Sequence, residues 1–70
     1  MDRVGVISTN LASIGYDAET RMLEVAFHNG TIYAYFDVPQ AVYEKLLSSE
    51  SKGKYFNRLI RDQYDFRQLK

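Results

Sequence analysis

The chain lacks several residue types on which common functional sites depend. Its 70 residues contain no cysteine, no tryptophan, one proline and one histidine. Without cysteine there is no disulfide, no thiolate nucleophile and no cysteine-ligated metal. A zinc site usually needs three or four side-chain ligands, so the single histidine, His28, excludes the histidine-rich sites as well. We therefore expect no bound metal and no cofactor.

Long hydrophobic runs and an excess of one charge are also absent. No apolar stretch approaches the roughly 20 residues of a membrane span, and the N-terminus has no secretory pattern. Nine basic side chains balance nine acidic ones, and this balance disfavours a binder of long polyanions. A 70-residue chain with 46% apolar residues is expected to form one cytoplasmic domain over residues 1–70.

Three β-rich segments predict an antiparallel meander between residues 11 and 38. Asn29-Gly30 separates the second from the third, and this dipeptide favours a two-residue type I′ turn. The register of such a turn would place six apolar side chains on one face, which are Leu23, Val25, Phe27, Ile32, Ala34 and Phe36. Because side chains alternate along a strand, Tyr33 and Tyr35 would then point to the opposite face, away from the core.

The segments around this hairpin have weaker patterns. A turn at residues 17–20 is expected to place Ile14 opposite Leu23 and Ala12 opposite Val25, on the same apolar face. The alternation around Val4 and Val6 allows a short edge strand. The tail from residue 63 alternates aromatic and polar residues and is expected to run extended across the fold.

Two helices are predicted to follow the sheet. Pro39 suits the first position of a helix, where its missing N–H needs no partner. Ser49 or Ser51 is expected to cap the second helix. The apolar residues at helical spacing are Val42, Tyr43, Leu46 and Leu47, then Tyr55, Phe56, Leu59 and Ile60. The predicted fold is α+β, a three-stranded antiparallel β-meander followed by two helices packed on one sheet face.

A set of short motifs follows in a fixed order along the chain. The motifs are Ile14-Gly15-Tyr16-Asp17, Leu23-Glu24-Val25-Ala26-Phe27, Asn29-Gly30, Tyr33-Ala34-Tyr35, Val38-Pro39, Val42-Tyr43, Ser51-Lys52-Gly53-Lys54-Tyr55-Phe56-Asn57 and Ile60-Arg61. This set resembles the KTSC domain family from about Ile7 to Leu69. The resemblance implies a small module that occurs at the C-terminus of some lysyl-tRNA synthetases and as a free-standing bacterial or phage protein. It implies RNA binding only through the attachment to a synthetase.

Tyr33 and Tyr35 are the first candidates for a binding site. Two tyrosines spaced by one residue on an open sheet face can stack on nucleic-acid bases, and such stacking contributes about 1–3 kcal/mol per base. The alternative is that the tail, the N-terminal arm or a second subunit covers both rings, since tyrosine is common in strands and interfaces.

Basic residues are concentrated in the last third of the chain. Residues 1–49 have a net charge of −3 and residues 50–70 a net charge of +3. Lys54, Asn57, Arg58 and Arg61 share the polar arc of the second predicted helix, with Lys52 nearby. This arc could hold one or two phosphates, or it could be an ordinary solvated helix face.

The start of that helix is a second candidate for anion binding. The segment Ser51-Lys52-Gly53-Lys54 would combine free backbone N–H groups with two lysines. The alternative is a plain helix cap.

These observations predict a non-enzymatic binding module for RNA or a nucleotide-like, phosphate-bearing ligand. Its expected site residues are Tyr33, Tyr35, Ser51, Lys52, Lys54, Asn57, Arg58 and Arg61. We assign no catalytic residue, because the spacing of the residues indicates no catalytic partner for any serine or carboxylate. Two alternatives stay open: a small homo-oligomer, for example from a phage, that sequesters a nucleotide signal, and a protein–protein adaptor without a nucleotide ligand.

Overall fold

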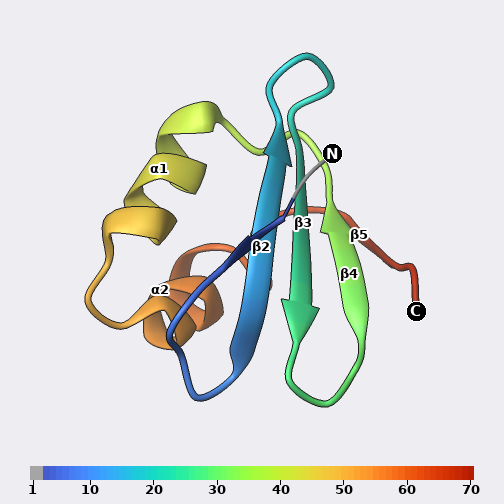
Figure 1. The fold of residues 1–70 in the computed structure, drawn as a ribbon. Helices are drawn as coiled ribbons and strands as arrows, with labels where there is room; N and C mark the ends of the chain where they lie inside the picture. Colours follow the sequence, from blue (N-terminus) through green and yellow to red (C-terminus); the bar gives the residue numbers. More distant parts are fainter. Residues whose placement is uncertain (1–2) are drawn as a thin grey trace.

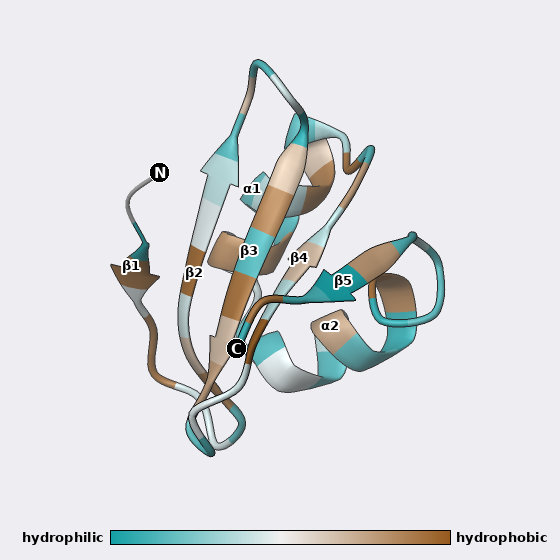
Figure 2. Ribbon diagram, turned by 90° about the vertical axis from the view of Figure 1, so that its right-hand side faces the viewer, coloured by the Kyte–Doolittle hydropathy of each residue, from teal (hydrophilic) through white to brown (hydrophobic). Residues whose placement is uncertain are grey.

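The computed structural model describes residues 3–70, which form a β-sheet layer and a helix layer (Figure 1). The elements are β1 (Val4–Gly5), β2 (Leu11–Asp17), β3 (Met22–Phe27), β4 (Ile32–Tyr35), α1 (Gln40–Ser48), α2 (Lys52–Leu59) and β5 (Phe66–Gln68). The strands form one antiparallel sheet in the order β1-β2-β3-β4-β5. Both helices lie against the same face of this sheet (Figures 1 and 2). The predicted α+β class with two helices on one sheet face is confirmed.

The sheet has five strands, so the predicted number of three is wrong. The two additional strands are the outermost ones, and they come from the N-terminal segment and the tail. β1 has two residues and β5 has three. Such short segments have little β-propensity of their own and form strands because each pairs with a longer neighbour.

The β3–β4 hairpin differs from the predicted register by one residue. Val25 lies opposite Tyr33, and Leu23 lies opposite Tyr35. The Phe27 N–H donates to the Thr31 carbonyl and the Gly30 N–H donates to the Phe27 carbonyl. The loop therefore has three residues, with Gly30 at φ 92° as its left-handed member.

This slip exchanges the two faces of β4. The expectation that Tyr33 and Tyr35 point away from the core is wrong, because both share the helix-covered face with Leu23 and Val25. Phe36, which was expected in the core, is 37% exposed.

The β2–β3 pairing differs from the prediction by two residues. Ile14 lies opposite Val25 instead of Leu23. A shift of two residues keeps the same face, so the core position of Ile14 is confirmed. A register irregularity between Leu11 and Ser13 changes the alternation there, and Leu11 is fully buried in place of the expected Ala12.

One apolar cluster joins the sheet to both helices. Its buried members are Leu11, Ile14, Leu23, Val25, Tyr35, Val38, Leu46, Phe56 and Ile60. Pro39 is the N-cap of α1 rather than its first helical residue. Ser51 is the N-cap of α2, as expected, but its side chain makes no capping hydrogen bond. In Figure 2 β3 is coloured mostly as apolar, with one hydrophilic band between two apolar ones.

Neither helix in residues 3–70 has the length and hydrophobicity of a membrane span.

Candidate functional site

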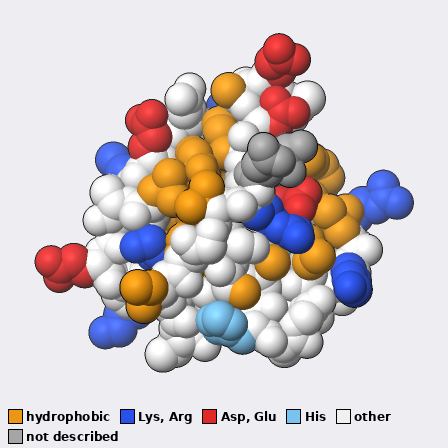
Figure 3. Space-filling model, viewed as in Figure 1, with side chains coloured by type: hydrophobic (Ala, Val, Ile, Leu, Met, Phe, Trp, Pro, Cys, Tyr) orange, Lys and Arg blue, Asp and Glu red, His pale blue; other side chains and the backbone are white. Residues whose placement is uncertain are grey.

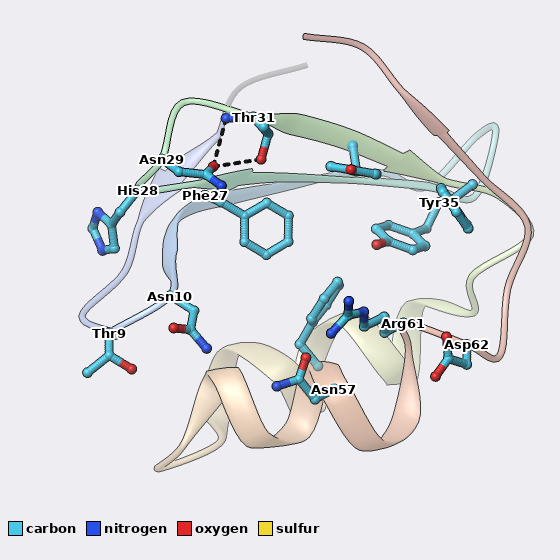
Figure 4. Close-up of a pocket in the computed structure, with 13 residues that line it drawn as sticks. Thr9, Asn10, Phe27, His28, Asn29, Thr31, Tyr35, Asn57, Arg61 and Asp62 are labelled. Atoms are coloured by element: carbon cyan, nitrogen blue, oxygen red, sulfur yellow. Dashed lines mark hydrogen bonds between the residues drawn. The ribbon is translucent and has the colours of Figure 1, made fainter.

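A groove of about 680 Å³ opens between the sheet and α2 (Figure 4). Its walls come from the β1–β2 loop, the β3–β4 hairpin, the end of α2 and the start of β5. The lining residues are Thr9, Asn10, Phe27, His28, Asn29, Thr31, Tyr33, Tyr35, Phe56, Asn57, Arg61, Asp62 and Phe66. Small-molecule sites in proteins usually have volumes of about 300–1,000 Å³, so this groove is large enough for one nucleotide.

Five aromatic rings form a continuous cluster along the groove. The centroids of Phe27 and Phe56 lie 5.5 Å apart, and those of Tyr35 and Phe56 lie 5.4 Å apart, both edge to face. The Phe66 ring lies 5.8 Å from Tyr33 and 5.7 Å from Tyr35. Because the rings come from β3, β4, α2 and β5, the groove exists only when all four elements are packed together.

Tyr35 connects the aromatic cluster to the charged end of the groove. Its side chain is 3% exposed. Burial raises the pKa of Tyr35 above its ordinary value of 10.0, and the positive charge of Arg61 partly opposes this rise. The hydroxyl therefore stays protonated at neutral pH. It can donate one hydrogen bond and accept another within the groove.

Of the side chains predicted to bind from the second helix, only those of Asn57 and Arg61 line the described groove. Asn57 lies on α2, and Arg61 lies two residues after its end. The Arg61 N–H donates to the Phe56 carbonyl over 2.9 Å, which fixes this residue against the last turn of α2. Figure 4 shows the Arg61 side chain pointing away from Asp62, toward the space below the Phe27 and Tyr35 rings. The groove thus has one arginine and one aspartate in its lining.

The other predicted residues lie outside the groove lining. Lys54 and Arg58 are exposed on α2. The Lys52 ammonium donates to the Ser49 carbonyl over 2.9 Å. The predicted site is therefore divided: Tyr33, Tyr35, Asn57 and Arg61 come together, and Ser51, Lys52, Lys54 and Arg58 do not join them.

Hydrogen bonds join the two loops at the uncharged end of the groove. The Ser8 hydroxyl oxygen accepts from the N–H groups of Asn10 and Leu11 at 3.3 and 3.2 Å. His28 makes two bonds to this loop: its N–H donates to the Asn10 carbonyl (3.1 Å), and its Nε2 lies 2.9 Å from the Ser8 carbonyl oxygen. These bonds hold the loop containing Asn10 against the tip of the β3–β4 hairpin.

The β1–β2 loop lies near the start of α2, at Gly53. A Cβ atom at Gly53 would lie 3.4 Å from the Asn10 Nδ2 atom and 3.6 Å from the Ser8 hydroxyl oxygen. Both distances are ordinary van der Waals contacts, so a small side chain would also fit at Gly53. The Asn10 amide lies at the edge of the groove (Figure 4).

Sequence reasoning missed the aromatic and polar residues that come from the sheet and its loops. Phe27 and Phe56 were assigned to the core, although both also line the groove. The Asn29-Gly30 loop was predicted as a turn, but it was not connected with the polar residues 8–10 before β2. Their common location at one end of an antiparallel sheet is the signal that could have joined them, once the register was right.

The surface charge is mixed on the face seen in Figure 3. Acidic and basic side chains are both scattered around its outline, and no patch of one sign covers it. Among residues 3–70 no group of three or more His, Asp or Glu side chains is arranged to hold a metal ion. The concave, aromatic groove is therefore the feature of the described chain that best suits a ligand.

Comparison with solved structures gives a close match in fold. The crystal structure of a KTSC domain protein from Yersinia pestis aligns with a TM-score of 0.93 at 36% sequence identity. The match covers 99% of this chain and 97% of that protein.

Two kinds of relative appear among the curated proteins. An uncharacterised protein of Stutzerimonas stutzeri is 42% identical over 64 residues, covering 91% of this chain and 90% of its own length. A lysine–tRNA ligase of Nostoc punctiforme is 37% identical over 59 residues, covering 84% of this chain but 10% of the ligase. The family profile of the KTSC domain matches residues 7–64. The chain therefore belongs to the KTSC domain family.

Proposed function

We propose that residues 1–70 act as one non-enzymatic module that binds RNA or a nucleotide-like, phosphate-bearing ligand in the groove between the sheet and α2. One observation carries this proposal: five aromatic rings and Arg61 line the same cavity of about 680 Å³. The similarity to part of a lysine–tRNA ligase supports a nucleic-acid context.

The aromatic cluster supplies the stacking surface. Phe66 is 56% exposed, so part of its ring is accessible to a ligand at the mouth of the groove. Tyr33 is partly buried beside it, and its hydroxyl donates to the Gln68 Oε1 atom over 3.4 Å. Stacking of a base on such rings contributes about 1–3 kcal/mol and tolerates any base.

Arg61 supplies the contact to phosphate. A guanidinium binds phosphate through paired hydrogen bonds, which are stronger than those between neutral groups. The exposed cations Lys54 and Arg58 lie outside the groove lining, so we assign them no direct contact with the ligand. This places the proposed phosphate contact at the end of α2 rather than at its start.

A pair of arginine variants tests this assignment. Titration calorimetry would measure the binding of nucleoside 5′-monophosphates and short single-stranded RNA to the native chain, to Arg61→Ala and to Arg58→Ala. We expect Arg61→Ala to weaken binding about tenfold or more, because a hydrogen bond to a charged group contributes about 1.5–3 kcal/mol. Arg58→Ala removes the same charge three residues earlier and should weaken binding less than about threefold.

Equal losses in the two arginine variants would place the ligand on the exposed helix face instead. Absence of binding by every nucleotide and RNA at low salt would remove the proposed function, because phosphate contacts are strongest under that condition.

Exposed apolar side chains on the last strand and directly after it favour a second function, that of a protein-interaction module or a homo-oligomer. Phe66 is 56% exposed and Leu69 is 50% exposed, and β5 is an edge strand. Edge strands and exposed aromatics are common at protein interfaces. Native mass spectrometry of the purified chain would show a monomer if the groove alone is used. It would show a defined oligomer, with or without a retained nucleotide, if this surface is an interface.

A further inference from the structure

The two ends of the groove differ in their chemistry (Figure 4). At the end formed by the β1–β2 loop and the hairpin tip, the lining groups are hydroxyls, amides and one imidazole, from Thr9, Asn10, His28, Asn29 and Thr31. At the opposite end, the lining includes Tyr35, Arg61 and Asp62, and the charges of Arg61 and Asp62 both act on the Tyr35 hydroxyl. The aromatic rings occupy the space between the two ends. A ligand that fits the groove must therefore have one uncharged polar part and one part that can lie near both a positive and a negative side chain.

The side-chain amides that line the groove are not equivalent. The Asn29 Oδ1 atom accepts from the Thr31 N–H at 3.0 Å and from the Thr31 hydroxyl at 2.7 Å, so this oxygen serves the turn. Within residues 3–70, no hydrogen bond to another protein group engages the side-chain amide of Asn10 or Asn57. Both amides border the groove from opposite elements, the β1–β2 loop and α2 (Figure 4).

A free primary amide presents a donor and an acceptor side by side. The hydrogen-bonding edge of a nucleobase presents the complementary pattern, and proteins that bind single strands read bases through this edge. The backbone of Asn10 is held by the bond from the His28 N–H to the Asn10 carbonyl. The loop is thus held in place before a ligand arrives, which favours selective recognition.

The charged end limits how much phosphate the groove can take. Arg61 and Asp62 are adjacent in sequence and both line the groove, so the net charge of this end is close to zero. A triphosphate or a long polyanion would find no excess of positive charge there. One phosphate against the guanidinium, with a ribose hydroxyl near the carboxylate, matches the charges present.

We infer that the groove recognises its ligand mainly through the base: the Asn10 and Asn57 amides read the edge of one unpaired nucleobase, the rings stack on it, and Arg61 holds a single phosphate. This inference rests on the proposed function and specifies its ligand as a nucleoside monophosphate unit. The unit can be a free mononucleotide or one nucleotide of a single-stranded RNA, because both present the same base, ribose and phosphate.

Two ligands and two variants test this inference by calorimetry. Nucleoside 5′-monophosphates contain base, ribose and phosphate, whereas ribose 5-phosphate lacks the base. We expect ribose 5-phosphate to bind at least about tenfold more weakly than the best monophosphate. Asn57→Leu should weaken monophosphate binding about tenfold, because it removes one or two hydrogen bonds, and should leave binding of ribose 5-phosphate unchanged. The matched control Gln40→Leu removes an exposed amide from α1 and should change neither affinity.

Other outcomes separate this inference from the proposed function. Equal affinity for ribose 5-phosphate and the monophosphates, with both lost in Arg61→Ala, would overturn base recognition while the groove still binds a phosphate. The same affinity for all monophosphates in Asn57→Leu and in the native chain would overturn the role of the Asn57 amide. Absence of binding by all of these ligands and by single-stranded RNA would overturn both proposals.

A further titration distinguishes a free mononucleotide from one nucleotide of a single-stranded RNA. A single-stranded RNA hexamer that binds more tightly than its monophosphates, with the same sensitivity to Asn57→Leu, would support a base presented by RNA. Equal or weaker affinity for the hexamer, with monophosphate binding still dependent on Asn57, would support a free mononucleotide.

Discussion

The first and last turns of α2 carry similar polar residues in different surroundings. The first turn presents Lys52 and Lys54 beside the loop that holds Asn10. The last turn places Phe56 in the core, at 2% exposure, and leads directly to Arg61 in the groove. Charge alone makes both turns suitable for an anion, but only the last turn adjoins an aromatic cluster and a cavity.

The difference shows that the border of the buried helix face is where a binding side chain is best placed. Asn57 directly follows the buried Phe56, and Arg61 directly follows the buried Ile60. Arg58 is about 200° around the helix from Phe56, at 100° per residue, and faces solvent. Residues at the border can reach a groove between the helix and the sheet, whereas residues at the centre of the polar arc cannot.

The largest expected effect concerns the ring that anchors the last turn of α2. Phe56→Ala should reduce the free energy of unfolding by about 3–5 kcal/mol, because it leaves a cavity next to Phe27 and Tyr35. Leu59→Ala on the same helix is the control, since Leu59 is 48% exposed, and should cost less than about 1 kcal/mol. Urea unfolding measures both. Equal losses would mean that Phe56 does not anchor the helix.

A smaller effect concerns the tyrosine that faces the last turn of α2. The raised pKa of Tyr35 means that the folded chain holds this proton more tightly than the unfolded chain. This contribution to stability is fully present below pH 10.0 and is lost as the pH rises through the folded pKa. The free energy of unfolding should therefore fall less steeply between pH 8 and pH 12 in Tyr35→Phe than in the native chain. Parallel curves would contradict the burial of this hydroxyl.

A still smaller effect is expected from the lysines of the first turn. The double substitution of Lys52→Ala and Lys54→Ala should change nucleotide affinity less than about twofold at 0.15 M salt, because neither ammonium lines the groove and exposed charges are screened within about 8 Å. Calorimetry with a nucleoside monophosphate measures this change. A tenfold loss would show that the first turn contacts phosphate and would remove the distinction between the two turns.

The smallest effect is expected at the N-cap of α2. A serine at this position normally contributes about 1 kcal/mol through its side-chain bond to the helix. Ser51 makes no such bond, so Ser51→Ala should change the free energy of unfolding by less than about 0.5 kcal/mol. A loss near 1 kcal/mol in thermal or urea unfolding would show that the cap forms in solution.

The sequence predicted the class of the fold better than it predicted the site. Hydrophobic periodicity and turn residues identified β2, β3, β4 and both helices, because those elements bury one face each. The Asn29-Gly30 signal located the hairpin correctly, but it fits both a two-residue loop and a three-residue loop that ends in a left-handed glycine. The choice between these loops decides which face receives Tyr33 and Tyr35, and the sequence does not make that choice.

The groove depends on contacts between residues far apart in the chain. Its Asn10 and Phe66 come from segments whose own patterns are short, and they are placed by pairing with β2, β3 and β4. Asn57 and Arg61 were predicted as binding residues from helix periodicity. Periodicity could not show that these two residues line the groove while Lys54 and Arg58 do not, because that depends on the angle at which α2 packs on the sheet.

Backbone NMR with a nucleoside 5′-monophosphate tests the central claim most directly, because it maps the contact on every residue at once. The account predicts shift changes at residues 9–10, 27–35, 56–62 and 66, around the groove, with little change at residues 51–54. Shift changes confined to residues 51–54, or no change at saturating nucleotide, would contradict it.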